Sequence, residues 1–145
     1  IPMNPELLDL AEKGDPKAVD LMMDWAHGPA GHFGGHPVPG LHHMNLGGSI
    51  VTNGSIKNAL GVDFRACDNY KNGFEAAKKI KCPTLNILGD RDRMCPVKEG
   101  KKLADNIEDS HVEIIENCGH MILLEEAGKS LEILKKFIRK NHPTE

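Results

Sequence analysis

Hydrophobic and polar positions follow two different patterns in this chain, and the change falls after Cys82-Pro83. Before it, apolar residues recur at helical spacing between glycines and prolines. After it, two short apolar runs, Thr84–Leu88 and Val112–Ile115, alternate with amphipathic stretches. Strands that alternate with helices predict right-handed crossovers and a parallel sheet. The expected fold class is therefore α/β.

The first part of the chain predicts two helices. Asn4-Pro5-Glu6 combines a capping side chain with a proline at the first helical position, and Gly14 marks the end of that helix. Asp15-Pro16 repeats this start, and Gly28 is the expected end of the second helix. The second helix has one apolar face, formed by Val19, Met22, Met23 and Ala26.

Residues 28–48 are expected to lack regular structure, because they contain seven glycines as well as prolines. Loops of this length are uncommon in compact domains and typically cover a site or move. Short helical pieces are expected after it, at residues 55–60, 63–70 and 74–79.

The second part predicts about two strands with flanking helices. One helix is expected from Pro96 to about Ile107. Two parallel strands alone do not form a stable sheet, and parallel strands normally have both faces covered. We therefore expect further strands from a missing N-terminal half or from another copy, and we interpret a chain that begins at Ile1 as a piece of a longer one. The last helix is expected to be amphipathic, with Leu124, Ala127, Leu131, Leu134 and Ile138 on its apolar face.

The loops that follow the two apolar runs carry the candidate chemistry. Gly89-Asp90-Arg91-Asp92 follows the first run, and Gly119-His120 follows the second. The carboxyl ends of parallel strands lie in one crevice, so these loops are expected to meet. Imidazole can take a proton from a hydroxyl nucleophile and return it, and a carboxylate can fix its tautomer. A carboxylate and then a histidine form the late part of the order Ser…Asp…His.

The nucleophile of such a triad is missing from the chain. The Gly-x-Ser-x-Gly turn occurs nowhere, and Ser49 follows two glycines without the x-Gly that the turn needs. A cysteine nucleophile is an alternative, because Cys118 precedes His120 by two residues and Cys95 lies in the acid loop. Buried, inert thiols are nevertheless commoner. The serines Ser49, Ser55, Ser110 and Ser130 are interpreted as caps or loop residues.

The segment Lys79–Asp92, KIKCPTLNILGDRD, resembles the penultimate strand and acid loop of the α/β-hydrolases. Cys118-Gly119-His120, with the residues up to Glu125, is similar to their histidine loop. The resemblance runs from about residue 74 to residue 141, and residues 1–73 look like the end of the helical cap that these enzymes insert above the active site. Asn86 departs from it, because an amide inside this strand must find a partner or cost stability.

The resemblance implies an α/β-hydrolase of the serine-esterase type, divided into a cap remnant (1–73) and the C-terminal part of the core (74–145). It implies that Asp92 is the acid and His120 the general base. Asp90 is the rival acid, but the family places the acid three residues after the glycine. The intact protein is expected to hydrolyse a small ester-like substrate without a cofactor, and this piece alone is expected to be inactive.

Composition excludes several other classes. The net charge is −3, from 18 basic and 21 acidic residues, and this balance does not predict nucleic-acid binding. The chain contains no run of roughly 20 apolar residues, so no membrane span is expected. The four cysteines lack CxxC spacing, which disfavours a zinc or redox site. We expect a reducing, cytoplasmic setting.

Two non-catalytic alternatives stay open, the first being a module that binds a divalent metal through its histidine-rich loop or a small ligand through its apolar cap. Glycines between His32 and His36 disfavour a helical ligand pair, so no metal site is assigned. The second is a hydrolase scaffold that has lost its chemistry. Met22, Met23 and Trp25 could line an acyl pocket, although plain helix packing is the preferred interpretation of this stripe. Five of the eight histidines gather here: His27, His32, His36, His42 and His43.

Overall fold

The computed structural model describes residues 3–29 and 58–141. The expected irregular segment therefore lies outside the described residues, apart from Gly28 and Pro29. The same holds for His32, His36, His42 and His43, and for residues 55–57 of the helix expected at 55–60.

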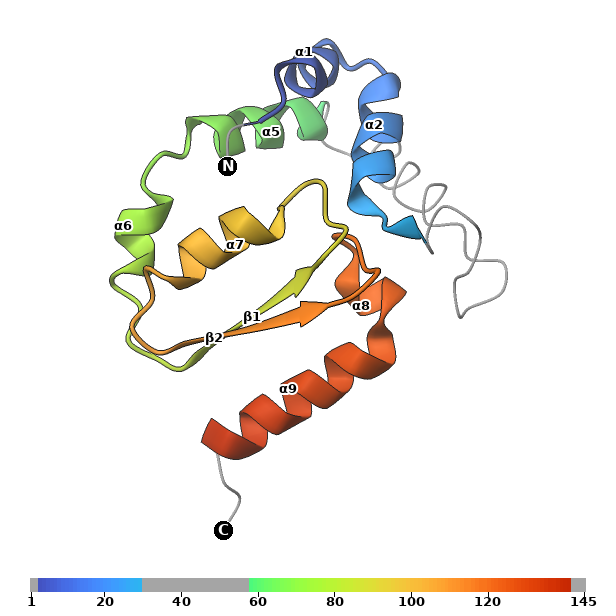
Figure 1. Cartoon of the computed structure of the whole chain (residues 1–145). Coiled ribbons are helices and arrows are strands. Elements are labelled where there is room, and N and C mark those ends of the chain that lie inside the picture. The colour runs from blue at the N-terminus through green and yellow to red at the C-terminus, as the bar shows by residue number, and fades with distance from the viewer. Residues whose placement is uncertain (1–2, 30–57, 142–145) are drawn as a thin grey trace.

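Two strands form the centre of the molecule (Figure 1), β1 (Thr84–Gly89) and β2 (Ser110–Ile115). Helix α7 (Val97–Ala104) covers one face of the strands, and α9 (Ala127–Asn141) lies on the other. Three further helices, α1 (Pro5–Lys13), α2 (Lys17–Ala26) and α5 (Ala59–Asn69), form a group beyond α7. The two short helices are α6 (Gly73–Ala77) and α8 (Ile122–Glu125).

The two strands are parallel, with Thr84 opposite Ser110 and Gly89 opposite Ile115. This arrangement confirms the α/β prediction, although β2 begins two residues earlier than the apolar run at Val112. Both strands end at the same edge, and the acid loop and the histidine loop leave from that edge. Among the described residues, β1 pairs with β2 and with no other strand.

The polar residue inside β1 has the partner that it requires. The Asn86 side-chain amide donates to the Ser110 hydroxyl at 2.9 Å across the strand pair. This hydrogen bond offsets the cost of placing an amide in a half-buried strand.

Local signals determine both ends of α1. The Asn4 side chain accepts hydrogen bonds from the amides of Glu6 and Leu7 at 2.9 and 3.1 Å, as an N-cap does. Gly14 ends the helix in the left-handed conformation at φ 68°. The Asp15 side chain accepts from the Lys17 amide at 2.9 Å and so caps the start of α2, as expected.

The expectation that Gly28 ends the second helix is wrong. Helix α2 stops at Ala26, and His27 is extended at φ −103°, ψ 139°. Gly28 instead makes a close approach, because a Cβ on it would lie 2.6 Å from the amide nitrogen of Gly119. Packing against the histidine loop, and not a helix cap, therefore requires glycine at this position.

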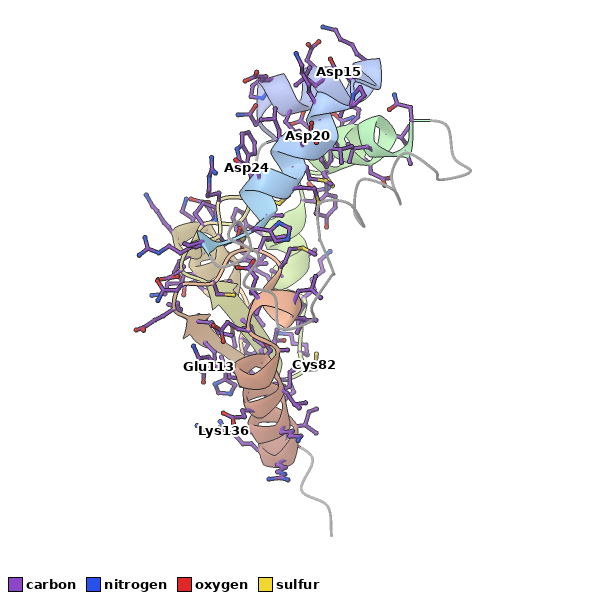
Figure 2. The ribbon with its side chains drawn as sticks, turned by 90° about the vertical axis from the view of Figure 1, so that its right-hand side faces the viewer. Asp15, Asp20, Asp24, Cys82, Glu113 and Lys136 are labelled. Atoms are coloured by element: carbon purple, nitrogen blue, oxygen red, sulfur yellow. The ribbon has the colours of Figure 1, made fainter. Side chains whose placement is uncertain are left out.

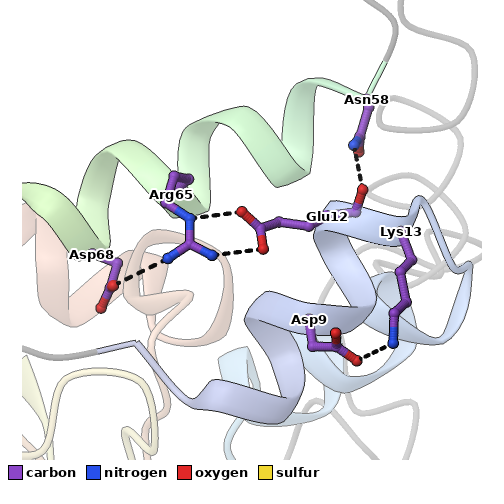
Figure 3. Close-up of polar contacts among 6 residues, drawn as sticks. All are labelled: Asp9, Glu12, Lys13, Asn58, Arg65 and Asp68. Carbon is purple, nitrogen blue, oxygen red and sulfur yellow. Dashed lines mark hydrogen bonds and ion pairs between the residues drawn. The ribbon is translucent and has the colours of Figure 1, made fainter.

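The helices α1, α2 and α5 share a small core around Leu7, Ala11 and Ala18. Met22 and Trp25 pack against this core, so helix packing accounts for them. Figure 3 shows the polar link at its surface, where the Arg65 guanidinium binds both Glu12 carboxylate oxygens at 2.6 Å each. The Asn58 side chain also donates to the Glu12 carbonyl at 3.0 Å.

Three expected boundaries require correction. The two helical pieces expected at 55–60 and 63–70 are not separate over the described residues, because α5 runs without a break from Ala59 and includes Gly61. A Cβ on Gly61 would lie 2.6 Å from the Ala11 carbonyl oxygen, so glycine at this position lets α1 approach closely. Helix α7 ends at Ala104, short of Ile107. The single expected final helix is two helices, because Glu126 leaves the helical region at φ −134°, ψ 52°.

Helix α9 lies along the second face of the strands and contacts it only in part. The ring of Phe137 meets His111 edge to face at a centroid distance of 5.9 Å. Leu131 and Ile138 on the same helix are 51% and 53% exposed. Figure 2 shows α9, with Lys136, at the opposite end of the molecule from Asp20 on α2. Within the described part of the chain, no helix is both long and apolar enough to cross a bilayer.

Candidate active site

The acid loop follows β1 and holds Asp92 in a tight turn. One carboxylate oxygen, Oδ1, accepts hydrogen bonds from the amides of Met94 and Cys95 at 2.8 and 2.7 Å. Asp92 is only 8% exposed. An aspartate that accepts from amides two and three residues ahead closes its own turn. Local sequence therefore positions this side chain through Oδ1 and leaves Oδ2 available for another partner.

The histidine loop is joined to the acid loop by backbone hydrogen bonds. The Arg91 amide donates to the Cys118 carbonyl at 2.9 Å, and the Asp90 amide donates to the Ile115 carbonyl at 3.0 Å. The Asp90 carboxylate accepts from the Cys118 amide at 3.3 Å. A Cβ on Gly89 would lie 2.9 Å from the carbonyl carbon of Cys118, so the two loops approach closely because residue 89 is glycine.

The two side chains singled out from the sequence meet at this edge of the sheet. The Nδ1 atom of His120 lies 2.8 Å from Asp92 Oδ2. A carboxylate only accepts, so Nδ1 carries the proton and Nε2 is left to act as an acceptor. Asp90, the rival acid, contacts the Cys118 backbone instead. The geometry thus distinguishes the two aspartates, although a catalytic role for Asp92 and His120 stays a prediction.

Burial differs sharply between the two partners. The side chain of Asp92 is 4% exposed and that of His120 is 43% exposed. The hydrogen bond that His120 donates to Asp92 raises the pKa of His120 above its ordinary value, and partial burial opposes this rise. The carboxylate is therefore shielded from water while the imidazole stays open to an incoming group.

An open cavity of about 730 Å³ lies beside His120. Its walls are mostly apolar and come from β1, the acid loop and α8. Neither Trp25 nor the methionines of α2 line it, so the acyl-pocket alternative for those residues has no support here. The lining residues on β1 and α8 are Leu85, Ile87, Leu88, Ile122, Leu123 and Leu124.

The two cysteines of the acid and histidine loops, Cys95 and Cys118, are poorly suited to act as nucleophiles. Cys118 is fully buried, and burial raises the pKa of its thiol to about 12. Burial and the nearby Asp92 carboxylate also raise the pKa of Cys95. A thiolate is the reactive form of cysteine, so both groups stay protonated at neutral pH.

The described serines do not supply the missing group either. Ser110 begins β2 and accepts from Asn86. Ser130 is a buried helical residue and not a cap or loop residue, because its hydroxyl donates to the Glu126 carbonyl inside α9 at 2.8 Å. Ser49 and Ser55 lie outside the described residues.

The metal-binding alternative falls largely on residues that the structure does not describe. His27, the one described member of the histidine group, is buried, and its Nδ1 atom donates to the Met23 carbonyl at 2.7 Å. Over residues 3–29 and 58–141, no three His, Cys, Asp or Glu side chains gather as a metal site would need.

Sequence reasoning missed a contact between the end of α2 and the histidine loop. The Ala26 carbonyl accepts hydrogen bonds from the amides of His120 and Met121 at 2.8 and 3.1 Å. It also missed Glu125, whose carboxylate accepts from the amides of Gly28 and Gly119 at 2.9 Å each. No periodicity signals such contacts, since they join segments that are distant in the sequence.

Part of the chain is similar in sequence to known hydrolases. A family model described as "Serine hydrolase (FSH1)" matches residues 54–122. Monoacylglycerol lipase ABHD6 of Bos taurus is 39% identical over 67 residues, which are 46% of this chain and 20% of the lipase. Proline iminopeptidase of Lactobacillus crispatus (strain ST1) is 36% identical over 64 residues, or 44% of this chain and 22% of that protein.

Solved structures extend the similarity over nearly the whole chain. A thermophilic esterase matches with a TM-score of 0.76 at 26% identity, covering 97% of this chain and 52% of the esterase. The esterase EaEST from Exiguobacterium antarcticum matches in fold with a TM-score of 0.72 at 19% identity, covering 92% and 46%. The chain thus spans about a fifth of the curated relatives and about half of these solved structures.

The parallel strands with their flanking helices and these matches place the chain in the α/β-hydrolase superfamily. Within that superfamily, its similarity is to serine hydrolases and esterases.

Proposed function

We propose that the intact protein hydrolyses an ester or similar acyl bond through a nucleophile–His–Asp triad. Asp92 is the acid of this triad and His120 is the general base. The observation that carries the proposal is the 2.8 Å contact between His120 Nδ1 and Asp92 Oδ2, in which the carboxylate is buried and the imidazole is accessible.

The geometry supports a two-step reaction. His120 Nε2 takes the proton of the nucleophile as that group attacks the carbonyl carbon, and then gives it to the leaving alcohol. Water, deprotonated by the same nitrogen, attacks the acyl-enzyme and releases the carboxylic acid. Asp92 keeps Nδ1 protonated and stabilises the imidazolium that forms in each step. No cofactor takes part in this scheme.

The nucleophile in this proposal comes from outside the 145 residues. Two observations support this: the chain contains no Gly-x-Ser-x-Gly turn, and burial raises the pKa of the Cys118 thiol, two residues before His120, to about 12. The free edge of β1 among the described residues could accept the strand that carries it. A longer chain or a partner copy could supply that strand.

The apolar cavity beside His120 favours a substrate with an acyl chain. Its lining from β1 and α8 is aliphatic, and it opens next to the accessible imidazole. One of the similar proteins is a monoacylglycerol lipase by name, and several similar structures are esterases. We therefore infer a neutral ester of a fatty or shorter acyl group as the substrate class.

The experiment is an assay of the full-length protein with p-nitrophenyl butyrate. The His120→Ala variant is expected to lose on the order of 10⁴-fold or more in kcat, as loss of a general base does in such triads. His111→Ala is the matched control, because His111 lies on β2 at the far face and should leave the rate unchanged. Equal rates for wild type and His120→Ala would end the proposal.

A further inference from the structure

The end of α2 contacts both catalytic loops. The Arg93 guanidinium in the acid loop lies 3.0 Å from the Asp24 carboxylate, and its carbon lies 6.0 Å from the ring centroid of Trp25. On the other side, the Ala26 carbonyl accepts from the amides of the histidine loop. The ion pair is exposed and is expected to contribute little, so the hydrogen bonds to the histidine loop dominate this contact.

Glu125 stands at the junction of these segments. Its Oε2 atom accepts from the amide of Gly28 and from the amide of Gly119, at 2.9 Å each. Both donors are backbone groups, one just beyond α2 and the other directly before His120. Hydrogen bonds from amides to an ionised carboxylate are about twice as strong as neutral ones.

The space around this carboxylate leaves no room for a side chain on either donor. A Cβ on Gly28 would lie 2.6 Å from Glu125 Oε2, and one on Gly119 would lie 2.8 Å from Oε1. The second oxygen, Oε1, is buried and has no hydrogen-bond partner among the described residues. Oε2 therefore makes both of the backbone contacts described for this carboxylate.

We propose that Glu125 is a positioning residue, whose single oxygen bridges Gly28 at the end of α2 to Gly119 and thereby holds His120 in contact with Asp92. This inference rests on the proposed function only for the role of His120. The bridge itself is a structural claim that requires no turnover to test.

Two variants separate the reach of the side chain from its charge. Glu125→Asp keeps the charge but is one methylene too short to contact both amides. Glu125→Gln keeps the reach and an acceptor oxygen but removes the charge. Glu126→Gln is the matched control, because it removes the same charge from the next residue, whose carboxylate lies 3.5 Å from Lys129.

The first readout is amide hydrogen exchange in the full-length protein. Glu125→Asp releases at least one of the two amides, and the loss of a hydrogen bond to a charged acceptor should speed exchange at that amide by up to about 100-fold. Glu125→Gln should speed it by no more than about tenfold. Amides in α1 serve as the internal check that the variants stay folded.

The second readout is the imidazole titration of His120 by NMR. If Glu125 acts by positioning, the pKa of His120 should fall further in Glu125→Asp than in Glu125→Gln, because only the first variant loosens the contact with Asp92. The reverse order would overturn the proposal, since it would mean that the charge alone acts. Unchanged exchange at Gly28 and Gly119 in Glu125→Asp would overturn it as well.

These outcomes are independent of the ester assay. If the full-length protein hydrolyses no ester, the bridge can still be present in the exchange data. If the bridge is absent, the His120→Ala comparison still decides the proposed function. In the full-length enzyme, the positioning role predicts a lower kcat for Glu125→Asp with an unchanged KM.

Discussion

His120 and Asp92 lie 28 positions apart in the sequence, yet their side chains meet at 2.8 Å at the common edge of two parallel strands. Asp92 is closed into its turn by two backbone amides, so only one of its oxygens is free to contact the imidazole. Local hydrogen bonds thus fix the side chain of Asp92, whereas the pairing of β2 with β1 brings His120 to it.

Replacement of Asp92 by asparagine should disable the pair while leaving the loop nearly intact. Asparagine can present its amide nitrogen to the ring and favour the wrong tautomer, which costs about 10⁴-fold in kcat in a well-studied triad. We expect a loss of that order for ester hydrolysis by the full-length protein. Asp90→Asn is the control, since that carboxylate accepts from the Cys118 amide at 3.3 Å and lies 3.7 Å from the Arg91 side chain instead of contacting the imidazole. Similar losses in both variants would contradict our assignment of the acid.

The pKa of His120 predicts how stability changes with pH. Because Asp92 raises this pKa in the folded state, the imidazolium contributes stability that is fully present below about pH 6.5, the ordinary value for histidine. That contribution is lost as the pH rises through the folded-state pKa. The free energies of unfolding in urea of wild type and His120→Gln should therefore differ most at low pH. They should converge above the folded-state pKa of His120. A gap that widens from pH 6 to pH 9 would show that the sign is wrong.

Thiol accessibility offers a separate test of the cysteine alternative. Cys67 and Cys82 are exposed, whereas Cys118 is buried with a pKa raised to about 12. Iodoacetamide at pH 8 should modify the first two rapidly and leave Cys118 unmodified until the chain unfolds. Peptide mass spectrometry over a time course measures the order. Rapid labelling of Cys118 in the folded chain would revive it as a candidate nucleophile.

Two glycines are expected to respond in opposite directions to alanine. A Cβ on Gly89 would meet the Cys118 backbone, so Gly89→Ala should destabilise the chain by about 1–3 kcal/mol through overpacking. Gly128 has no neighbouring atom within 4 Å of such a Cβ and lies in α9. Gly128→Ala should stabilise it by up to about 1 kcal/mol. Denaturant unfolding gives both values, and equal effects would contradict the close approach at Gly89.

Much of the fold follows from local signals. The Asn4 cap, the Gly14 end of α1 and the Asp15 start of α2 depend on neighbouring residues alone. The break at Glu126 could not be foreseen, because the apolar period continues through it, and Leu124 lies on α8 while Leu131 lies on α9. The division into a cap and a core at residue 73 stays a prediction.

The candidate site also contains features that the sequence predicts and features that it does not. Parallel pairing of two neighbouring strands is enough to bring Asp92 and His120 together, so the order of the motifs predicts their contact. The choice of Asp92 over Asp90 rested on resemblance, and the turn bonds of Asp92 give it a physical reason. Glu125 gave no signal, because its partners are backbone amides, one of them 97 positions away.

The sequence by itself determined the alternation of strands and helices, the two ends of α1, which residue types could move a proton, and which nucleophile motif is missing. These depend on caps, periodicity and spacing, whose physics acts within a few residues. Only the tertiary structure decided that the end of α2 binds the histidine loop, that Glu125 bridges Gly28 and Gly119, and that Cys118 is buried. Those features depend on close packing between segments far apart in the chain, where the exclusion of water and the fit of atoms determine which groups meet.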